Sequence, residues 1–289
     1  HRGFCVFEPN KRETMQKPLE EMRDGQSIEL LKELHILTRD GKINQDSRRK
    51  LKQVYHLYNF IEPLLKDLQA GGAALNLVDH GAGKSYLGFI IYDLFYKTLQ
   101  EGHVYSIETR DELIKKSVDL QKKLNFPRMS FLNVSVADSI SSKQVPEKID
   151  IVTALHACDT ATDDAIDFAL AKKSKHLVLV PCCQAEVARH LKQNKAKQLA
   201  NPLAEVWRHP IHTREFGSHL TNVLRCLRLE AHGYQVTVTE LVGHEHSMKN
   251  ELIVATRIEG PRQRTAERLQ WILEEMGLHE LIKRFSTEA

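Results

Sequence analysis

The sequence predicts an α/β fold built on a doubly wound, mostly parallel sheet of seven strands with a terminal antiparallel hairpin. Short runs rich in Val, Ile, Leu and Thr recur from residue 74 onward, as expected of strands buried on both faces. Apolar residues at helical spacing separate the early runs, which favours parallel strands joined by helical crossovers. The last two runs are separated only by residues 242–250, too few for a helical crossover, so these two strands are expected to pair antiparallel.

Each expected element follows from such a run. The strands are Ala74–Asp79, His103–Glu108, Met129–Val134, Ile149–Leu155, His176–Val180, Gln235–Leu241 and Glu251–Thr256. Between the first two strands, one apolar stripe predicts a helix: Leu87, Ile90, Ile91, Leu94 and Phe95. A looser stripe between residues 113 and 124 predicts the next helix, and Asp111 and Glu112 suit its positive amino end.

Three regions lie outside this alternating pattern. Residues 1–70 are expected to form a helical N-terminal region, with two apolar stripes: Leu30, Leu31, Leu34 and Ile36, then Leu51, Val54, Leu57, Tyr58, Ile61 and Leu65. Residues 71–259 are expected to form the main domain, which contains a polar insertion at about 185–211 interrupted by Pro202 and Pro210. Residues 260–289 carry a terminal amphipathic helix.

Composition narrows the class of protein. The apolar fraction of 42% and charged fraction of 27% are ordinary for a soluble globular chain. No apolar run approaches the roughly 18 residues that span a bilayer, and no secretory signal pattern opens the chain, which begins at His1. Five cysteines favour free thiols in a reducing cytoplasm. Because the net charge is only +3, a nucleic-acid partner would have to be bound by local basic patches.

The segment 76–86, Asn-Leu-Val-Asp-His-Gly-Ala-Gly-Lys-Ser-Tyr, resembles two nucleotide motifs. Gly83-Lys84-Ser85 looks like the end of a P-loop, but the glycine that a P-loop needs five residues earlier is Val78, in a buried strand. A strand, an acidic residue, Gly81-x-Gly83 and a helix instead indicate a Rossmann-like turn. Tyr86 replaces the third glycine of a dinucleotide site, so a cofactor without a pyrophosphate is favoured.

Three carboxylates at successive strand ends point to an adenosyl cofactor. Asp79 accompanies the glycines, which admit the methionine part of the ligand. Glu108 ends the second strand, where an acidic residue accepts hydrogen bonds from both ribose hydroxyls. Asp138 follows the third strand and is expected to lie at the adenine edge. Lys84 and Ser85 begin a helix facing the cofactor carboxylate, and Leu155, at the tip of the fourth strand, completes the expected cofactor site.

Two further motifs follow the fourth and fifth strands: Leu155-His-Ala-Cys-Asp-Thr-Ala-Thr-Asp-Asp-Ala-Ile166 and Val180-Pro-Cys-Cys-Gln184. With the glycine turn, they resemble class I methyltransferases of the "methyltransferase domain" family, which includes bacterial members and eukaryotic methyltransferase-like relatives. They are also similar to acceptor-stem tRNA 2′-O-methyltransferases, although Gln184 stands where those enzymes have histidines. The resemblance spans roughly residues 40–256 and implies a Rossmann-like fold, S-adenosyl-L-methionine as cofactor and a transferase activity.

Methyl transfer needs a nucleophile held in line with the methyl group, and a base if that nucleophile carries a proton. His156 and Asp159 are the candidates for a base or an orienting residue. The alternatives are a histidine bonded to backbone and an aspartate that caps the next helix, with Thr160 and Thr162 as rival caps.

Cysteines offer a second chemistry. Cys158 and Cys182 follow the fourth and fifth strands, as do the cysteines of pyrimidine C5 methyltransferases of RNA, so Cys182 and Cys183 are kept as candidate catalytic residues. Small buried side chains packed beside the cofactor are the alternative that the surrounding sequence favours. His209, His212, His244 and His246 accompany these cysteines, but no Cys-x-x-Cys occurs, so no metal is expected.

Basic residues suggest an RNA substrate, either rRNA or tRNA. Eight Lys or Arg occur from Lys172 to Arg208, and Lys192, Lys195 and Lys197 are the expected phosphate contacts. A second run contains Arg48 and Arg49, and Lys249 and Asn250 are minor substrate candidates. Each basic run has a simpler interpretation as a solvated helix face. A protein or small-molecule methyltransferase, or a non-catalytic scaffold that binds S-adenosylmethionine or RNA, is the alternative function, and the oligomeric state is left open.

Overall fold

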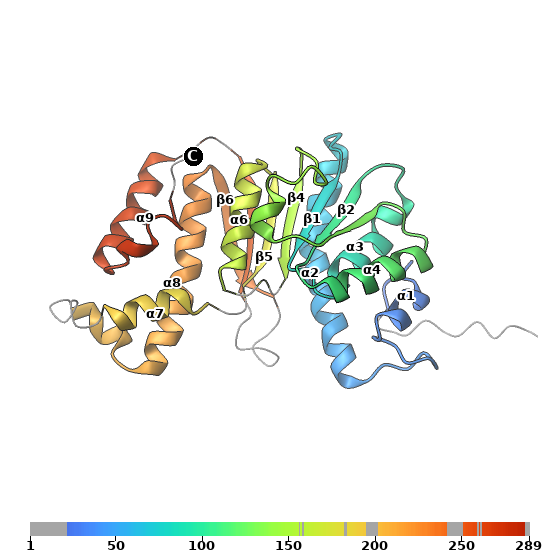
Figure 1. Ribbon diagram of the computed structural model, residues 1–289, viewed down its shortest axis with the longest axis horizontal. Coiled ribbons are helices and arrows are strands. Elements are labelled where there is room, and N and C mark those ends of the chain that lie inside the picture. The colour runs from blue at the N-terminus through green and yellow to red at the C-terminus, as the bar shows by residue number, and fades with distance from the viewer. Residues whose placement is uncertain are drawn as a thin grey trace, which may run out of the picture.

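A computed structural model describes residues 22–155, 157, 159–181, 184–194, 202–241, 251–258, 260 and 262–286. In these ranges the chain forms one seven-stranded sheet in the order β3-β2-β1-β4-β5-β7-β6 (Figure 1). The strands are β1 (Asn76–His80), β2 (His103–Ile107), β3 (Met129–Leu132), β4 (Ile151–Leu155), β5 (His176–Val180), β6 (Tyr234–Glu240) and β7 (Glu251–Arg257). All seven predicted strands are confirmed, with shifts of one or two residues at most ends.

Strand direction fixes which loops share an edge of the sheet. Strand β1 pairs in parallel with β2 and β4, and β5 pairs in parallel with β4. Strand β7 pairs antiparallel with both β5 and β6, which confirms the predicted terminal hairpin. The amino end of β7 therefore lies at the same edge as the carboxyl ends of β1, β2, β4 and β5.

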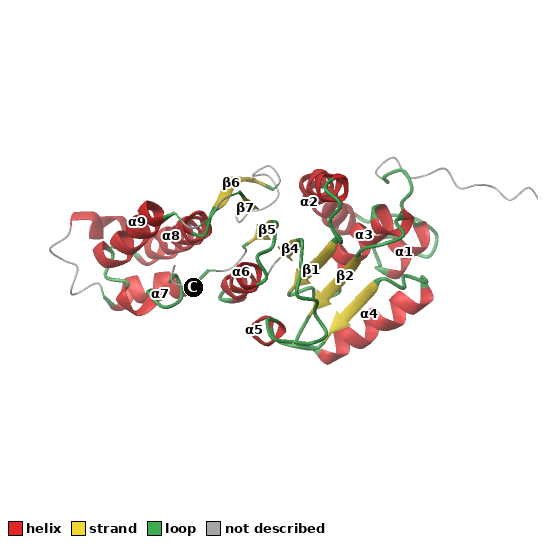
Figure 2. Cartoon of the chain, turned by 90° about the horizontal axis from the view of Figure 1, so that it is seen from above, coloured by secondary structure: helices red, strands yellow, loops and turns green. Residues whose placement is uncertain are grey.

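Helices cover both faces of the sheet, as a doubly wound fold requires (Figure 2). One layer contains α1 (Ile28–Glu33), α2 (Gln45–Ala70), α3 (Tyr86–Leu94) and α4 (Asp111–Lys123). The opposite layer contains α5 (Val136–Ser139), α6 (Ala161–Ala171) and α8 (Pro210–Ala231). Helices α7 (Glu186–Gln193) and α9 (Gln263–Glu275) pack on α8, and short 3-10 turns occur at Tyr96–Thr98, Pro202–Trp207 and His279–Leu281.

Alternation along the strands divides the core into two layers. Leu77 packs in the cluster shared with α2 and α3, whereas Val78 packs in the cluster shared with α6. Val178 and Leu179 of β5 separate in the same way. Every apolar position expected on the N-terminal helices is buried: Leu30, Leu31, Leu34, Ile36, Leu51, Val54, Leu57, Tyr58, Ile61 and Leu65.

A third cluster lies away from the sheet and revises the expectation for residues 185–211. Val187, Leu191 and Trp207 are all buried there against α8, so this segment has an apolar face. Pro210 occupies the first turn of α8, a position that proline favours. The expected terminal helix is α9, which buries Leu269 and Leu273 in the same cluster. None of the helices in the described ranges is long and apolar enough to cross a bilayer.

Candidate functional site

The loop that follows β1 bends through two left-handed glycines. Gly81 and Gly83 have φ of 61° and 57°, a region that glycine enters without strain. A Cβ on Gly81 would lie 3.6 Å from the Cα of Ala157, so this loop runs close to the backbone that follows β4. Ser85, also left-handed at φ 55°, is buried at the amino end of α3, and Lys84 beside it is exposed. The predicted glycine turn therefore joins β1 to a helix that starts at Tyr86.

Asp79 is a buried carboxylate at the end of β1. The residue is only 2% exposed, and its Oδ1 accepts a hydrogen bond from the Thr153 hydroxyl at 2.7 Å. Burial raises the pKa of Asp79 to about 7, and the bond from Thr153 opposes this only in part. A cationic group placed beside Asp79 would favour the carboxylate, because an opposite charge lowers the pKa of an acid.

Glu108 is also buried, but its pKa moves in the opposite direction. Its Oε2 accepts from the Gly83 N–H at 2.9 Å, and its Oε1 accepts from the backbone N–H groups of Thr109 and Arg110. Two further bonds, from Nε and NH2 of Arg110, lie at 3.0 and 3.1 Å. Burial alone would raise the pKa of Glu108, yet the bonds and charge from Arg110 and the bond from Gly83 lower it to about 2. Glu108 is therefore an ionised acceptor tied directly to the glycine loop.

These groups fit S-adenosylmethionine, a ligand with a sulfonium, an ammonium, a carboxylate and two ribose hydroxyls. An ionised acceptor at the end of β2 suits the ribose hydroxyls, and Asp79 suits a cationic part of the ligand. The glycines leave the backbone of the loop open to a close approach. When bound, the cofactor supplies an electrophilic methyl group, and the residues of this chain bind and orient it.

The other two expected cofactor residues lie nearby in the fold. Asp138 is exposed on the short helix α5 after β3, where its N–H and carboxylate both bond to the Ser135 hydroxyl, at 3.0 and 2.6 Å. This pair caps the helix. Leu155 is half-buried at the end of β4, directly before the loop that approaches Gly81. Their contact with a cofactor stays a prediction.

Asp159 links the two distal motifs instead of capping the helix that follows it. Its backbone is left-handed at φ 50°, and its Oδ1 accepts a hydrogen bond from the Ala185 N–H at 3.2 Å. Thr160 takes the N-cap position of α6 without a side-chain cap bond. The Thr162 hydroxyl donates to the Ala157 carbonyl at 2.6 Å. The loop after β4 is thus held to its own helix and to the loop after β5.

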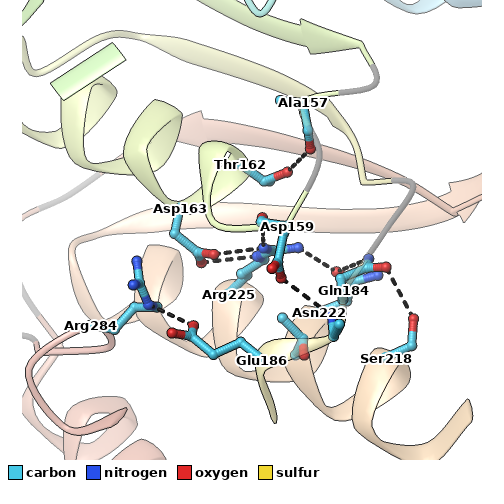
Figure 3. A network of polar contacts seen from close by, with 12 residues as sticks. Ala157, Asp159, Thr162, Asp163, Gln184, Glu186, Ser218, Asn222, Arg225 and Arg284 are labelled. Atoms are coloured by element: carbon cyan, nitrogen blue, oxygen red, sulfur yellow. Dashed lines mark hydrogen bonds and ion pairs between the residues drawn. The ribbon is translucent and has the colours of Figure 1, made fainter. Parts of the chain in front are cut away.

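Figure 3 shows a buried network beside these loops, centred on a residue outside the sequence motifs. Arg225 of α8 forms a two-point ion pair with Asp163 of α6, at 2.9 and 2.6 Å. Asn222 accepts bonds from Arg225 and from Gln184, the residue that distinguishes the second motif. In the sequence, Asn222 and Arg225 fall on the apolar side of a helical pattern. The pattern alone does not show what a polar residue on that side would bind.

Several expected residues lie outside the described ranges. They are the candidate catalytic residues His156, Cys182 and Cys183, the neighbouring Cys158, and the candidate substrate contacts Lys195, Lys197, Lys249 and Asn250. Among the described residues, no group of three or more His, Cys, Asp or Glu is arranged to hold a metal ion.

The described basic residues separate into two edges of the sheet. Lys192 is exposed on α7, and Arg49 is exposed near the start of α2, where it lies 3.7 Å from Asp46. Arg48 is half-buried beside it. Lys172, Lys173 and Lys175 precede β5, so they lie at the amino edge of the parallel strands, opposite the glycine loop. The basic run of the sequence therefore does not form one continuous patch.

Comparison with known proteins agrees with this site. Residues 49–190 match a family model described as "Methyltransferase domain". No curated protein matches the chain. The fold is similar to that of a putative O-methyltransferase from Klebsiella pneumoniae, at 11% identity and a TM-score of 0.47, with 80% of this chain and 89% of that one covered.

Two other solved structures resemble it at comparable levels. Magnesium protoporphyrin IX methyltransferase from Synechocystis PCC 6803, solved with bound SAH, is 14% identical with a TM-score of 0.44, covering 79% of this chain and 94% of that one. A chain of a fibrillarin/Nop5p complex is 16% identical with a TM-score of 0.42, covering 64% and 73%. These likenesses concern the fold and do not extend to a substrate.

The family model includes β1 to β5, with the glycine loop, both buried carboxylates and both distal motifs. The strand order and the terminal hairpin are those expected of class I methyltransferases. Residues 49–190, just under half of the chain, therefore match a methyltransferase domain, and the glycine loop and two buried carboxylates within them suit S-adenosylmethionine as the cofactor.

Proposed function

We propose that this methyltransferase modifies RNA, with rRNA or tRNA as the substrate class. The observation that carries the proposal is the placement of exposed basic side chains on two elements that flank the carboxyl edge of the sheet. Figure 1 shows the amino end of α2 and helix α7 on the lower side of the view, where β1 ends. Arg49, Lys50 and Lys52 are exposed at the first site, and Arg189 and Lys192 at the second.

Basic groups at this edge would hold a phosphate backbone across the loops that carry the methyl acceptor. The helical N-terminal region, residues 1–70, and the insertion, about 185–211, would shape the two sides of the substrate site, outside a core of residues 71–259. His156 and Asp159 would serve as base and orienting residue, with Cys182 and Cys183 as the alternative catalytic pair. A cytoplasmic location, with free thiols, belongs to the same proposal.

The test is methyl transfer from S-adenosyl-L-[methyl-³H]methionine to total RNA and, separately, to a nuclease-treated protein extract. Nuclease-sensitive label in RNA supports the proposal. Label confined to protein overturns it, and so does cofactor binding without transfer to either pool, which favours the scaffold.

A charge-reversal pair tests the RNA surface directly. Lys192→Glu should lower RNA affinity and reduce the slope of its salt dependence by about one, because one phosphate contact is lost. Lys173→Glu is the matched control, since it makes the same charge change at the opposite edge of the sheet. Equal affinities for the two variants would contradict the proposed surface.

A further inference from the structure

We propose that Arg225 is a positioning residue that holds the loops after β4 and β5 and the start of β7 in one arrangement at the substrate edge of the sheet. The inference rests on the proposed function in one respect, because the proposed function places the methyl acceptor at the loops after β4 and β5.

The side chain of Arg225 is buried and held in one orientation by its hydrogen bonds. It is 1% exposed on α8, and four of the five N–H groups of its guanidinium are bonded. Two bonds go to the carboxylate of Asp163 on α6, at 2.9 and 2.6 Å. A planar guanidinium paired at two points with a carboxylate has little freedom to rotate, so its remaining donors point in defined directions.

One of those donors fixes the loop after β4. NH2 of Arg225 donates to the backbone carbonyl of Asp159 at 2.8 Å. The same residue accepts from the Ala185 N–H through its side chain, so the loop is held on both sides. Asp159 has a left-handed backbone, a conformation that non-glycine residues keep only where the surroundings impose it.

A second donor reaches the loop after β5 and the start of β7 through Asn222. NH1 of Arg225 donates to Asn222 Oδ1 at 3.1 Å, and the same oxygen accepts from Gln184 Nε2 at 2.9 Å. Gln184, in the loop after β5, is 5% exposed and also accepts from the Ser218 hydroxyl at 3.0 Å. The Asn222 amide donates to Glu251 Oε2 at 2.7 Å, at the first residue of β7. One asparagine therefore joins the end of β5 to the start of β7.

Gln184 is bonded at both ends within this network. Its amide nitrogen donates to Asn222 Oδ1 and its amide oxygen accepts from the Ser218 hydroxyl, so both ends of the side-chain amide are bonded. Gln184 thus acts through Asn222 and Arg225, and Figure 3 shows the chain of bonds that connects them.

The test compares Arg225→Lys with Arg228→Lys. Arg228 lies one turn further along α8, is also buried and pairs with Asp167 of α6 at 2.6 Å, but makes no described contact with the loops. Lysine keeps the positive charge in both variants and loses the fork of donors. A third variant, Gln184→Met, removes the amide that bonds to Asn222 and Ser218 and keeps the ion pair between Arg225 and Asp163.

The first measurement is hydrogen exchange at backbone amides 159–162 and 184–187. The others are the Kd for S-adenosylmethionine, the melting temperature, and kcat for methyl transfer to total RNA. The expected result is faster exchange in both segments for Arg225→Lys and Gln184→Met. In these variants kcat falls about 10- to 100-fold, as for a misplaced reacting group, while the cofactor Kd is unchanged. A variant that carries both Arg225→Lys and Gln184→Met should lose no more kcat than the worse of the two single variants, because both changes act on one network.

Arg228→Lys should lower the melting temperature without changing loop exchange or kcat. The inference is overturned if Arg225→Lys and Arg228→Lys give the same exchange in the two segments, or if the cofactor Kd rises in proportion to the loss of kcat. Absence of transfer to RNA by the wild-type enzyme would instead overturn the proposed substrate, and the exchange measurement would still decide the role of Arg225.

Discussion

The backbone N–H of Gly83 donates to the carboxylate of Glu108 at 2.9 Å, so the loop after β1 and the end of β2 form one unit. The carboxylate also accepts from the N–H groups of Thr109 and Arg110, just before α4, and from the Arg110 side chain. A single side chain thus sets the shape of the cofactor loop and begins the next helix. Its loss should affect the cofactor and the fold together.

Glu108→Gln should weaken S-adenosylmethionine binding about 10- to 100-fold, because a charge-assisted hydrogen bond contributes roughly 1.5–3 kcal/mol. Calorimetric titration measures the Kd. Glu112→Gln, an exposed change in the first turn of α4, is the control and should leave the Kd unchanged. Equal Kd values for the two variants would contradict this assignment.

Stability should depend on pH through Glu108 in the acidic range. Its folded pKa of about 2 lies below its usual value of 4.5. The stabilisation is therefore present above pH 4.5 and is lost as the pH falls toward 2. Urea unfolding between pH 6 and pH 3 should show a smaller loss of stability for Glu108→Gln than for the wild type. Identical pH slopes would show that the carboxylate is not held in this way.

Asp79 should behave in the opposite sense. Its folded pKa of about 7 exceeds its usual value of 3.8, so its contribution is fully present below pH 3.8 and is lost as the pH rises through 7. Asp79→Asn should therefore increase the free energy of unfolding at pH 8, by about 1–4 kcal/mol, and weaken cofactor binding. Calorimetry in buffers of different ionisation enthalpy should detect proton release on cofactor binding near pH 6.5 in the wild type, and none in the variant.

Gly83, in the cofactor loop, and Gly72, before β1 at the opposite edge of the sheet, are both left-handed and allow a matched pair of substitutions. Gly83→Ala and Gly72→Ala both place a side chain at positive φ, and each should cost roughly 1–2 kcal/mol of stability. Only Gly83→Ala should also raise the Kd for S-adenosylmethionine, because relief of the strain at positive φ would shift the loop and its N–H bond to Glu108. Thermal unfolding and cofactor titration measure the two effects; a raised Kd for Gly72→Ala would contradict the assignment.

Helices α7 and α8 meet at Gly217. A Cβ there would lie 2.6 Å from the Cα of Ala188, closer than the two backbones allow. Gly217→Ala should therefore force the helices apart and lower the melting temperature by several degrees, about 2–4 °C per kcal/mol for a chain of this size. Gly260→Ala, where an added Cβ meets nothing within 4 Å, is the control. RNA methylation should fall with Gly217→Ala while the cofactor Kd is kept.

Much of the fold could be predicted because buried strands have a strong sequence signal. Runs such as His176–Val180 are apolar on both faces and have the same limits in the structure as predicted. Helix α8 was not predicted, because its buried side includes Asn222, Arg225 and Arg228, which a hydrophobic pattern treats as surface residues. Their burial depends on partners in α6 and β7 that are distant in sequence.

The candidate site, too, could be predicted from the sequence only in part. The positions of Asp79 and Glu108 followed from strand ends and spacing, since local sequence determines where a strand stops. The opposite pKa shifts of these two carboxylates did not follow, because they depend on Thr153 and Arg110 and on burial. Asp159 was predicted either to orient the substrate or to cap a helix, and its bond to Ala185 required the packing of two loops.

The reversed direction of β7 has a consequence for the order in which the enzyme is made. The cofactor loop and the end of β2 can assemble once the first half of the chain has been synthesised. The bond between Asn222 and Glu251 cannot form until the last strand has left the ribosome and inserted between β5 and β6. The half of the site that binds the cofactor can therefore form before β7 is in place, whereas the network around Asn222 is complete only after β7 has paired with β5 and β6.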